Sequence, residues 1–458
     1  MVESVKSATE KQREFFFTHK TKSIEFRLLQ LRTLKKAILA YEERIYEALW
    51  KDLHKGKFEA YVTEIGIVLA EINLHIRNLK KWAKPEKVAT NQMIHFWSDS
   101  KILKEPYGLT LIIAPWNYPF QLLINPMVGA ISAGNCVALK ASEYTPETAE
   151  IMEQMITEFF PPEYVMYYQG GREANQSLLA QQWDFIFFTG SPLVGKVVME
   201  AAAGNLTPVS LELGGKSPCI VDRDADLKIA ASRIVWGKFL NAGQTCIAPD
   251  YLFVHHSVKA ELLALMKKKI EEYFGRNPQT SPDYARIATF AKTQRIAAFL
   301  NEGTIFTGGE VNIQERYISP TILTDISPGH SIMQEEIFGP LLPVMEFDGL
   351  EEVIKYVNMH PKPLALYYFS QDDEKQEEIL GKTSSGGMCI NEVVMHIANE
   401  QMPFGGVGHS GIGNYHGKYS FSTFSHSRSV LKKATWIDIP LRYPPYKNKL
   451  KFIKMLIK

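Results

Sequence analysis

The chain of 458 residues has few cysteines, almost no net charge and no long apolar run, and each of these features excludes a class of protein. Four cysteines without a Cys-x-x-Cys pair argue against a disulfide framework or a zinc site and favour a reducing compartment. Lys and Arg number 51 against 50 Asp and Glu, so the charge gives no reason to expect nucleic acid as a partner. The first residues lack the apolar core of a signal peptide, and no apolar run has spanning length, so we expect a cytoplasmic protein.

What is present is typical of a soluble α/β protein. Hydrophobic residues make up 45% and charged residues 22%, and the length favours two or three domains. Residues 8–84 show apolar positions at helical spacing, and this run ends at Pro85. Apolar strands at 110–114, 135–139, 164–168, 184–188 and 208–212 alternate with helical segments, which predicts a parallel sheet wound on both faces. The pattern resumes after residue 251, which predicts a second α/β domain.

Cys246 is the candidate nucleophile. It follows Phe239-Leu-Asn-Ala-Gly-Gln-Thr245, a turn-rich segment that leaves a sulfur accessible where a helix or strand would bury it. The alternative is that a cysteine is a small buried hydrophobe. That alternative suits Cys136, Cys219 and Cys389, because all three lie in apolar surroundings.

Glu212 is the candidate general base. It lies 34 residues before Cys246 in Leu211-Glu-Leu-Gly-Gly-Lys-Ser-Pro218, at the end of an apolar strand. Burial there would raise the pKa of the carboxyl group toward neutrality, where a general base is most useful. By itself, Glu212 could equally be a solvated residue at a strand end.

The two motifs together resemble those of the aldehyde dehydrogenase superfamily, in which they carry the base and the nucleophile. Residues 236–241 (Trp-Gly-Lys-Phe-Leu-Asn) and 246–251 (Cys-Ile-Ala-Pro-Asp-Tyr) look like the class 3 and fatty aldehyde dehydrogenase branch. The resemblance implies a Rossmann-type NAD-binding domain over 1–90 and 104–211, and a second α/β catalytic domain over 212–400. It also implies a small β-ribbon for oligomerisation over 91–103 and 415–436, followed by a tail over 437–458.

Asn117 lies just beyond the apolar strand that ends before Pro115-Trp-Asn-Tyr-Pro119. From the residues alone, an Asn that satisfies a turn is the simpler interpretation. The resemblance favours a catalytic one, because this is the family's oxyanion motif. The side-chain amide would then donate to the developing oxyanion.

The sequence lacks a Gly-x-Gly-x-x-Gly motif after any of these strands, but a helix is predicted directly after Thr189-Gly-Ser191, where unpaired N–H groups can face a pyrophosphate. Lys140 and Glu143 would meet the adenosine ribose, and a Glu there suits the free hydroxyls of NAD better than a 2′-phosphate. We therefore expect NAD, with NADP possible. The cofactor-binding residues implied by the resemblance are Lys140, Glu143, Thr189, Gly190, Ser191, Gly195, Leu213, Gly214, Glu336, Phe338 and Phe404.

The predicted reaction is oxidation of an aldehyde to an acid. The Cys246 thiolate attacks the aldehyde, and the resulting oxyanion accepts hydrogen bonds from the Asn117 side chain and the Cys246 N–H. Hydride then passes to the nicotinamide, which leaves a thioester. Glu212 activates water to hydrolyse this thioester. No step needs a metal. A rival enzyme is an aldehyde dehydrogenase that transfers the acyl group to coenzyme A, which commonly lacks the base. A catalytically silent homologue is the other alternative, and the complete set of site residues argues against it.

Medium or long aliphatic aldehydes, or aromatic ones, are the expected substrates, because the positions that resemble the family's pocket are mostly aromatic. They are Tyr61, Tyr118, Trp236, Thr245 and His396. Residues 446–458 form a basic amphipathic helix that either docks on the protein's own surface near the substrate entrance, which we favour, or contacts an anionic membrane peripherally. The class 3 resemblance also implies a homodimer.

Overall fold

The computed structural model describes residues 2–92, 95–438 and 440–456. The chain begins with the helices α1 (Val2–Phe17), α2 (Ile24–Leu53), α3 (Lys57–Ala60) and α4 (Gly66–Trp82), with a π-helix over Tyr61–Ile65. Leu31, Leu34 and Ile38 of α2, which recur at helical spacing, are fully buried. The helical run predicted for 8–84 is therefore confirmed, and α4 ends three residues before Pro85.

The first sheet has six strands in the order β17-β7-β6-β3-β4-β5. Its parallel strands are β3 (Leu109–Ile113), β4 (Cys136–Lys140), β5 (Val165–Tyr168), β6 (Phe185–Gly190) and β7 (Val209–Leu213), and each begins within one residue of its predicted start. The short β17 (Gly411–Ile412) pairs antiparallel with β7. The intervening helices are α5 (Gln121–Ala133), α6 (Pro146–Phe159), α7 (Arg172–Leu179) and α8 (Pro192–Ala203). Every residue of β3 and β4 is buried, as expected of central parallel strands.

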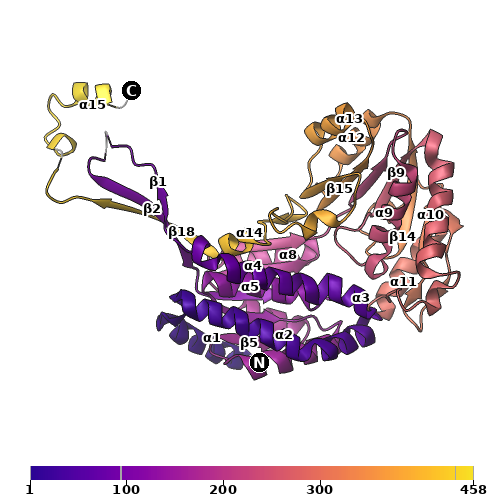
Figure 1. Cartoon of the computed structure of the whole chain (residues 1–458), viewed down its shortest axis with the longest axis horizontal. Coiled ribbons are helices and arrows are strands. Elements are labelled where there is room, and N and C mark those ends of the chain that lie inside the picture. Colours follow the sequence, from indigo (N-terminus) through magenta and orange to yellow (C-terminus); the bar gives the residue numbers. More distant parts are fainter. Residues whose placement is uncertain (1, 93–94, 439, 457–458) are drawn as a thin grey trace.

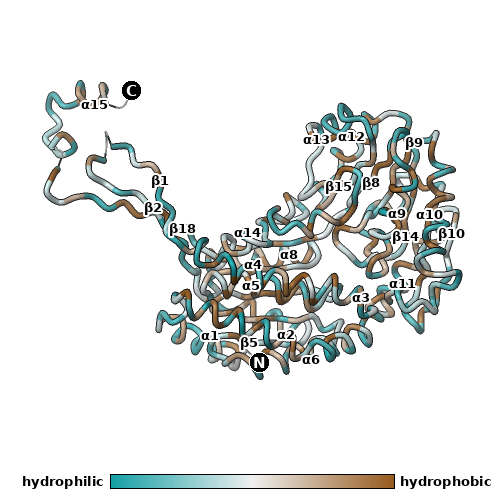
Figure 2. The backbone as a smooth tube through the Cα atoms, in the orientation of Figure 1, coloured by the Kyte–Doolittle hydropathy of each residue, from teal (hydrophilic) through white to brown (hydrophobic). Residues whose placement is uncertain are grey.

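The second sheet has seven strands in the order β10-β13-β14-β9-β8-β15-β16 and forms the other lobe (Figure 1). The strands are β8 (Pro218–Val221), β9 (Tyr251–His255), β10 (Thr304–Thr307), β13 (Thr321–Thr324), β14 (Leu341–Phe347), β15 (Ala365–Phe369) and β16 (Gly387–Ile390). The accompanying helices are α9 (Leu227–Phe239), α10 (Lys259–Phe274), α11 (Phe290–Ala298), α12 (Leu350–Met359) and α13 (Asp373–Lys382). Figure 2 shows hydrophobic residues along its central strands. The predicted second α/β unit is confirmed.

A three-stranded antiparallel arm projects from the first lobe (Figure 1). It comprises β1 (Glu86–Val88), β2 (Ser98–Pro106) and β18 (Ser425–Lys433). Of the β-ribbon predicted over 91–103 and 415–436, the first segment becomes strand only from Ser98, and the second is not all strand, because α14 (Lys418–Thr423) precedes β18. The helix forms where Ser420 and Phe424 pack against Gly129 of α5, where a Cβ atom would lie 2.9 Å from both side chains.

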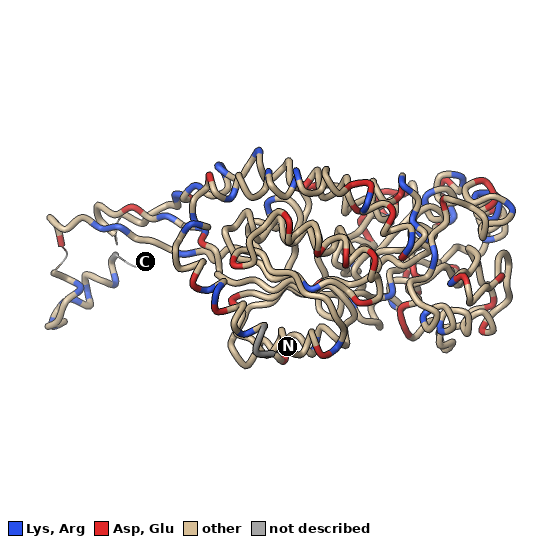
Figure 3. Tube along the Cα trace, turned by 90° about the horizontal axis from the view of Figure 1, so that it is seen from below, with Lys and Arg blue, Asp and Glu red and all other residues tan. Residues whose placement is uncertain are grey.

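The C-terminal helix α15 (Leu450–Leu456) lies beyond the arm, far from the two lobes (Figure 1). Its Leu450, Phe452 and Met455 side chains are exposed, so the docking on the chain's own surface that the sequence favoured is wrong for this chain. Of the residues predicted for this helix, Ile457 and Lys458 lie outside the described residues. Figure 3 shows that Lys and Arg residues occur along the arm and the tail. In the described part of the chain, no helix combines the length and apolarity needed to cross a bilayer.

Candidate active site

The loop that carries Cys246 has an unusual backbone. A short helical turn, Leu240–Gly243, follows α9, and Asn241, Ala242 and Gly243 have φ angles of 52°, 51° and 75°. A Cβ atom on Gly243 would lie 2.2 Å from the main-chain oxygen of Gly339, so only glycine fits there. This turn presents Cys246 at a partly exposed position, whereas Cys136 and Cys219 are fully buried.

Glu212 lies near the carboxyl end of β7, between Thr189 of β6 and Gly411 of β17. Its side chain is 3% exposed, and neither carboxyl oxygen has a hydrogen-bond partner among the described residues. Burial raises the pKa of Glu212 well above its usual value. A buried carboxyl group without a partner is free to accept a proton from a substrate or a water molecule.

Both groups line one cavity of about 350 Å³ at the carboxyl ends of the strands of the first sheet. This is where open α/β sheets place their ligands. The cavity brings together many residues that the sequence singled out: Asn117, Thr189, Gly190, Ser191, Glu212, Leu213, Gly214, Cys246, Glu336 and Phe338. The predicted nucleophile, base and amide donor therefore line the same cavity.

Asn117 is 2% exposed and is held between two loops. Its Nδ2 donates to the main-chain oxygen of Gln244 at 3.0 Å, and its own main-chain oxygen accepts from Nδ2 of Asn241 at 2.8 Å. Because a side-chain amide carries two N–H groups, one remains for a ligand. The hydroxyls of Tyr118 and Thr245, 2.6 Å apart, form a second link between the same loops.

The electrostatics of the cavity hold Cys246 as a thiol. Burial raises the pKa of the thiol well above its usual value, and the nearby carboxylates of Glu336 and Glu212 raise it further. Burial also raises the pKa of Glu336 to about 8, helped by the charge of Asp250 and opposed by a hydrogen bond from the Gly215 N–H. The cavity therefore contains two carboxyl groups with raised pKa values, and each can accept a proton once it is ionised.

Gly214 lets Glu336 approach the backbone closely, because a Cβ atom there would lie 2.1 Å from its Oε2. Phe338 adopts a φ of 52° and packs edge-on against the ring of Trp116, with 5.2 Å between ring centroids. Glu336 and Phe338 thus line the cavity from the second lobe, opposite the strands of the first sheet.

The start of α8 suits a pyrophosphate. Ser191 caps the helix, because its Oγ accepts from the Val194 N–H, and the Oγ of Thr189 has no partner among the described residues. A Cβ atom on Gly195 would lie 2.8 Å from Leu213, so glycine allows the helix to pack closely on β7. Unpaired N–H groups of the first helical turn can bind phosphate oxygens.

Three of the residues predicted to bind the cofactor do not line this cavity: Lys140, Glu143 and Phe404. Lys140 is buried at the end of β4, where its Nζ donates to the main-chain oxygen of Ala141 at 2.6 Å and lies 3.9 Å from Oε2 of Glu143. Burial lowers the pKa of Lys140. Phe404 is buried, and its ring stacks on that of His396 at 5.8 Å.

The residues predicted for the substrate pocket are Tyr61, Tyr118, Trp236, Thr245 and His396. None of these five is among the described residues that line the cavity of about 350 Å³. Tyr118 and Thr245 join the Asn117 and Cys246 loops, while Tyr61 and Trp236 are substantially exposed. His396 faces Sγ of Cys389 through its Nδ1 at 3.3 Å, and burial lowers its pKa to about 4. Their role toward substrate stays a prediction.

The sequence interpretation missed two cations in the cavity wall, Lys292 and Arg295 of α11. Nζ of Lys292 lies 4.9 Å from the centroid of Trp116, and Arg295 pairs with Glu335 at 3.3 Å. Both come from the second lobe and belong to no recognised motif. Their spacing of three residues on a helix was the one available signal, because it puts them on one face.

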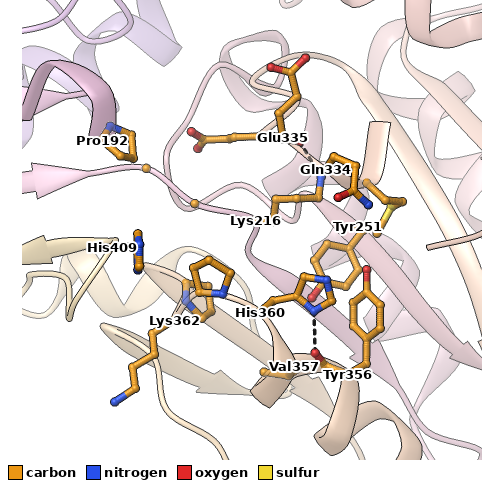
Figure 4. Close-up of a pocket in the computed structure, with 16 residues that line it drawn as sticks. Pro192, Lys216, Tyr251, Gln334, Glu335, Tyr356, Val357, His360, Lys362 and His409 are labelled. Atoms are coloured by element: carbon orange, nitrogen blue, oxygen red, sulfur yellow. Dashed lines mark hydrogen bonds between the residues drawn. The ribbon is translucent and has the colours of Figure 1, made fainter. Parts of the chain in front are cut away.

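A second cavity of about 330 Å³ lies beside the first and shares Pro192 and Glu335 with it (Figure 4). In its wall Lys216 forms an ion pair with Asp250, and its Nζ donates to the main-chain oxygens of Ile332 and Glu335 at 2.8 and 2.9 Å. Lys216 therefore braces the segment that carries Glu336. Among the described residues, no group of three His, Cys, Asp or Glu side chains is arranged to hold a metal ion.

Comparison with known proteins gives consistent results. The model of the aldehyde dehydrogenase family matches residues 1–430. The chain is 49% identical over 446 residues to 4,4'-diaponeurosporen-aldehyde dehydrogenase of Staphylococcus aureus, covering 97% of each chain. It is 44% identical to aldehyde dehydrogenase family 3 member B1 of Mus musculus, covering 98% of this chain and 96% of the other. The solved structure described as the substrate-bound state of Staphylococcus aureus AldH superposes with a TM-score of 0.97 at 48% identity, covering 99% of each chain.

Proposed function

Because the chain belongs to the aldehyde dehydrogenase family and is an NAD(P)-dependent oxidoreductase that converts aldehydes to carboxylic acids, we propose that Cys246, Asn117 and Glu212 carry out this chemistry. The observation that supports the assignment is their convergence on one cavity from three distant segments. The roles below follow from the contacts and charges of that cavity.

The first step is attack by sulfur. The Cys246 thiol loses its proton to a carboxylate of the cavity, for which both Glu212 and Glu336 are available. The sulfur then forms a bond to the aldehyde carbon, and the carbonyl oxygen becomes an oxyanion. The free N–H of the Asn117 amide and the Cys246 main-chain N–H donate to this oxygen, and one such donor is typically worth about 3 kcal/mol.

The residues at the start of α8 and around Glu336 fit a nicotinamide dinucleotide, which when bound accepts the hydride that leaves the substrate carbon. Thr189, Ser191 and the first N–H groups of α8 would hold the pyrophosphate, and Phe338 and Glu336 would meet the nicotinamide end. We propose NAD as the preferred cofactor, because the Glu143 carboxylate beside Lys140 would repel a 2′-phosphate.

The last step is hydrolysis of the thioester on Cys246. Glu212 takes a proton from a water molecule, the resulting hydroxide attacks the acyl carbon, and the acid leaves as the C–S bond breaks. The alternative acceptor, coenzyme A, needs no such base. The buried and unpartnered Glu212 therefore favours water as the acceptor.

For the substrate we propose medium or long aliphatic aldehydes, or aromatic ones. The Staphylococcus aureus relative is named for 4,4'-diaponeurosporen-aldehyde. The aromatic ring of Trp116, next to Asn117, lines the cavity and would supply an apolar wall for such a substrate. A series of aldehydes from acetaldehyde to hexadecanal, with benzaldehyde, would define the preference.

A single assay tests the reaction. NADH formation is followed with hexanal, with and without coenzyme A, and the product is identified. We expect the free acid in both cases, and no NADH from Cys246→Ala although this variant still binds NAD. An acyl-CoA product would contradict hydrolysis, and NADH formation by Cys246→Ala would contradict the role of the thiol.

We further propose a cytoplasmic homodimer formed through the arm, with peripheral membrane contact through the tail. The arm stands away from both lobes and exposes Trp97 and Trp436, whose rings lie 5.4 Å apart (Figure 1). Exposed aromatic residues on a projecting sheet suit contact with a second subunit. The exposed apolar side chains of α15 alternate with lysines, which suits an anionic membrane surface. Light scattering of the purified protein would give the mass of the oligomer.

A further inference from the structure

A fully buried ion pair lies beneath the loop that carries Asn117. Lys55 follows α2, and Glu64 lies in the π-helix Tyr61–Ile65. Their Nζ and Oε1 atoms are 2.7 Å apart, and both side chains are 0% exposed. A π-helix is rare and is frequently found at functional sites. Removing two charges from water is costly, and well-packed apolar residues would often be as stable, so the pair calls for an explanation beyond stability.

The pair holds the main chain on both sides of Tyr118. Oε2 of Glu64 accepts from the N–H groups of Phe120 and Gln121 at 3.1 and 2.9 Å. On the other side, Nζ of Lys55 donates to the main-chain oxygen of Asn117 at 3.4 Å. The ammonium also lies 4.2 Å from the centroid of the Tyr118 ring. The position of residues 117–121 is therefore tied to two charges from the N-terminal helices.

The same region reaches the nucleophile loop. The main-chain oxygen of Asn117, which accepts from Lys55, also accepts from the Asn241 side chain at 2.8 Å. The Asn241 N–H in turn donates to Oε1 of Glu59 at 3.0 Å. Burial raises the pKa of Glu59 to about 7. Lys55, Glu59 and Glu64 thus form one largely buried cluster. This cluster contacts both the Asn117 loop and the loop before Cys246.

We propose that Lys55 and Glu64 are positioning residues for the oxyanion site: they hold the main chain of residues 117–121 so that the Asn117 amide points to the oxygen of the aldehyde that Cys246 attacks. This inference rests on the oxyanion role proposed for Asn117. It assigns no contact between Lys55 or Glu64 and the substrate. Their effect reaches the reaction through the main chain of the Asn117 loop.

The first test compares Glu64→Gln and Lys55→Met with the wild-type enzyme. Displacement of a reacting group by about 1 Å can reduce the rate about 100-fold, so we expect kcat to fall about 10- to 100-fold. The KM for NAD and the rate of Cys246 alkylation by iodoacetamide, followed by mass spectrometry, should change less than about twofold, since alkylation forms no oxyanion. A parallel loss of alkylation and kcat would overturn the proposal.

The matched control is Glu71→Gln. Glu71 is also a buried carboxylate that accepts a main-chain N–H, from Gly417 at 2.7 Å, and it pairs with Nε2 of His75 at 3.0 Å. This variant should lower Tm yet keep kcat at temperatures below its transition. The double variant Lys55→Met with Glu64→Gln removes both charges and keeps an acceptor for the Phe120 and Gln121 N–H groups. It should recover Tm without recovering kcat, and recovery of both would overturn the proposal.

The decisive measurement is a double-mutant cycle with Asn117→Ala. If Glu64 acts through Asn117, Glu64→Gln lowers kcat in the wild-type background and leaves it unchanged in the Asn117→Ala background. An equal loss in both backgrounds would overturn the positioning role while leaving the proposed function intact. Full activity of Asn117→Ala alone would instead overturn the oxyanion role itself, and this inference with it.

Discussion

Replacement of Glu212 by Gln should separate the two halves of the reaction, which are NADH formation and hydrolysis of the thioester. The exchange leaves the side-chain volume almost unchanged and replaces one oxygen by an NH2 group. Glu212 is 3% exposed and neither oxygen has a described hydrogen-bond partner, so no such bond is lost in the fold. The variant should therefore fold, and its defect should be the loss of a proton acceptor.

The size of the defect follows from what else lines the cavity. A general base typically contributes about 100- to 10,000-fold to a rate. Glu336, with a pKa of about 8, lines the same cavity and can accept some of the protons that Glu212 would take from water. We therefore expect hydrolysis to slow about 100- to 1,000-fold, which corresponds to a barrier higher by about 3–4 kcal/mol.

Rapid mixing with NAD and hexanal provides the assay. The variant should release about one NADH per active site in a burst, because sulfur attack and loss of hydride do not need the hydrolytic base. The steady-state rate should then be low, and mass spectrometry should find an acyl group on Cys246. Equal loss of the burst and of turnover would refute the reasoning, and so would unchanged turnover.

The change of the hydrolysis rate with pH gives an independent check, because its direction can be predicted. Burial raises the pKa of Glu212, so the carboxylate form becomes more abundant as the pH rises toward that pKa. Hydrolysis by the wild-type enzyme should therefore accelerate with rising pH. The residual hydrolysis by Glu212→Gln should instead follow the titration of Glu336, whose pKa is about 8. A profile shared by both proteins would assign the titration to another group.

Three further predictions address the cofactor, the nucleophile loop and the tail. Glu143→Gln should raise kcat/KM for NADP relative to NAD about fivefold, because one carboxylate near a phosphate is worth about 1 kcal/mol in water, and steady-state kinetics with both cofactors would test this. Gly243→Ala should lower the free energy of unfolding in urea by about 2 kcal/mol more than the control Gly275→Ala, since both have positive φ but a Cβ atom meets nothing within 4 Å at Gly275. Truncation after Pro445 should reduce flotation with anionic vesicles, and equal flotation of both proteins would remove the membrane proposal.

Much of the fold could be predicted from local patterns. Strands β3, β4 and β6 appeared as apolar runs because they are buried on both faces, and burial on both faces requires a continuous apolar segment. The failures came where packing outweighed local pattern. Residues 418–423 form a helix because Ser420 and Phe424 fit against Gly129 of α5, a contact between segments far apart in the chain.

The candidate site divides in the same way. Cys246, Glu212 and Asn117 were recognisable because each lies in a short motif next to a strand end or a turn. Lys292 and Arg295 were not, because they reach the cavity only through the placement of α11 in the second lobe. No spacing along the chain indicates that Lys55 would lie beneath Asn117, 62 residues later.

The amino-acid sequence alone determined which segments become strands and helices, and which residues carry reactive groups, because both depend on side-chain types within a few neighbouring positions. Only the tertiary structure decided that Glu212 is buried with no hydrogen-bond partner among the described residues, that the pKa of the Cys246 thiol is raised, and that α15 stands clear of the two lobes. Burial and charge at a site depend on groups from both sheets and from the N-terminal helices. The packing of those elements sets the distances on which the chemistry depends.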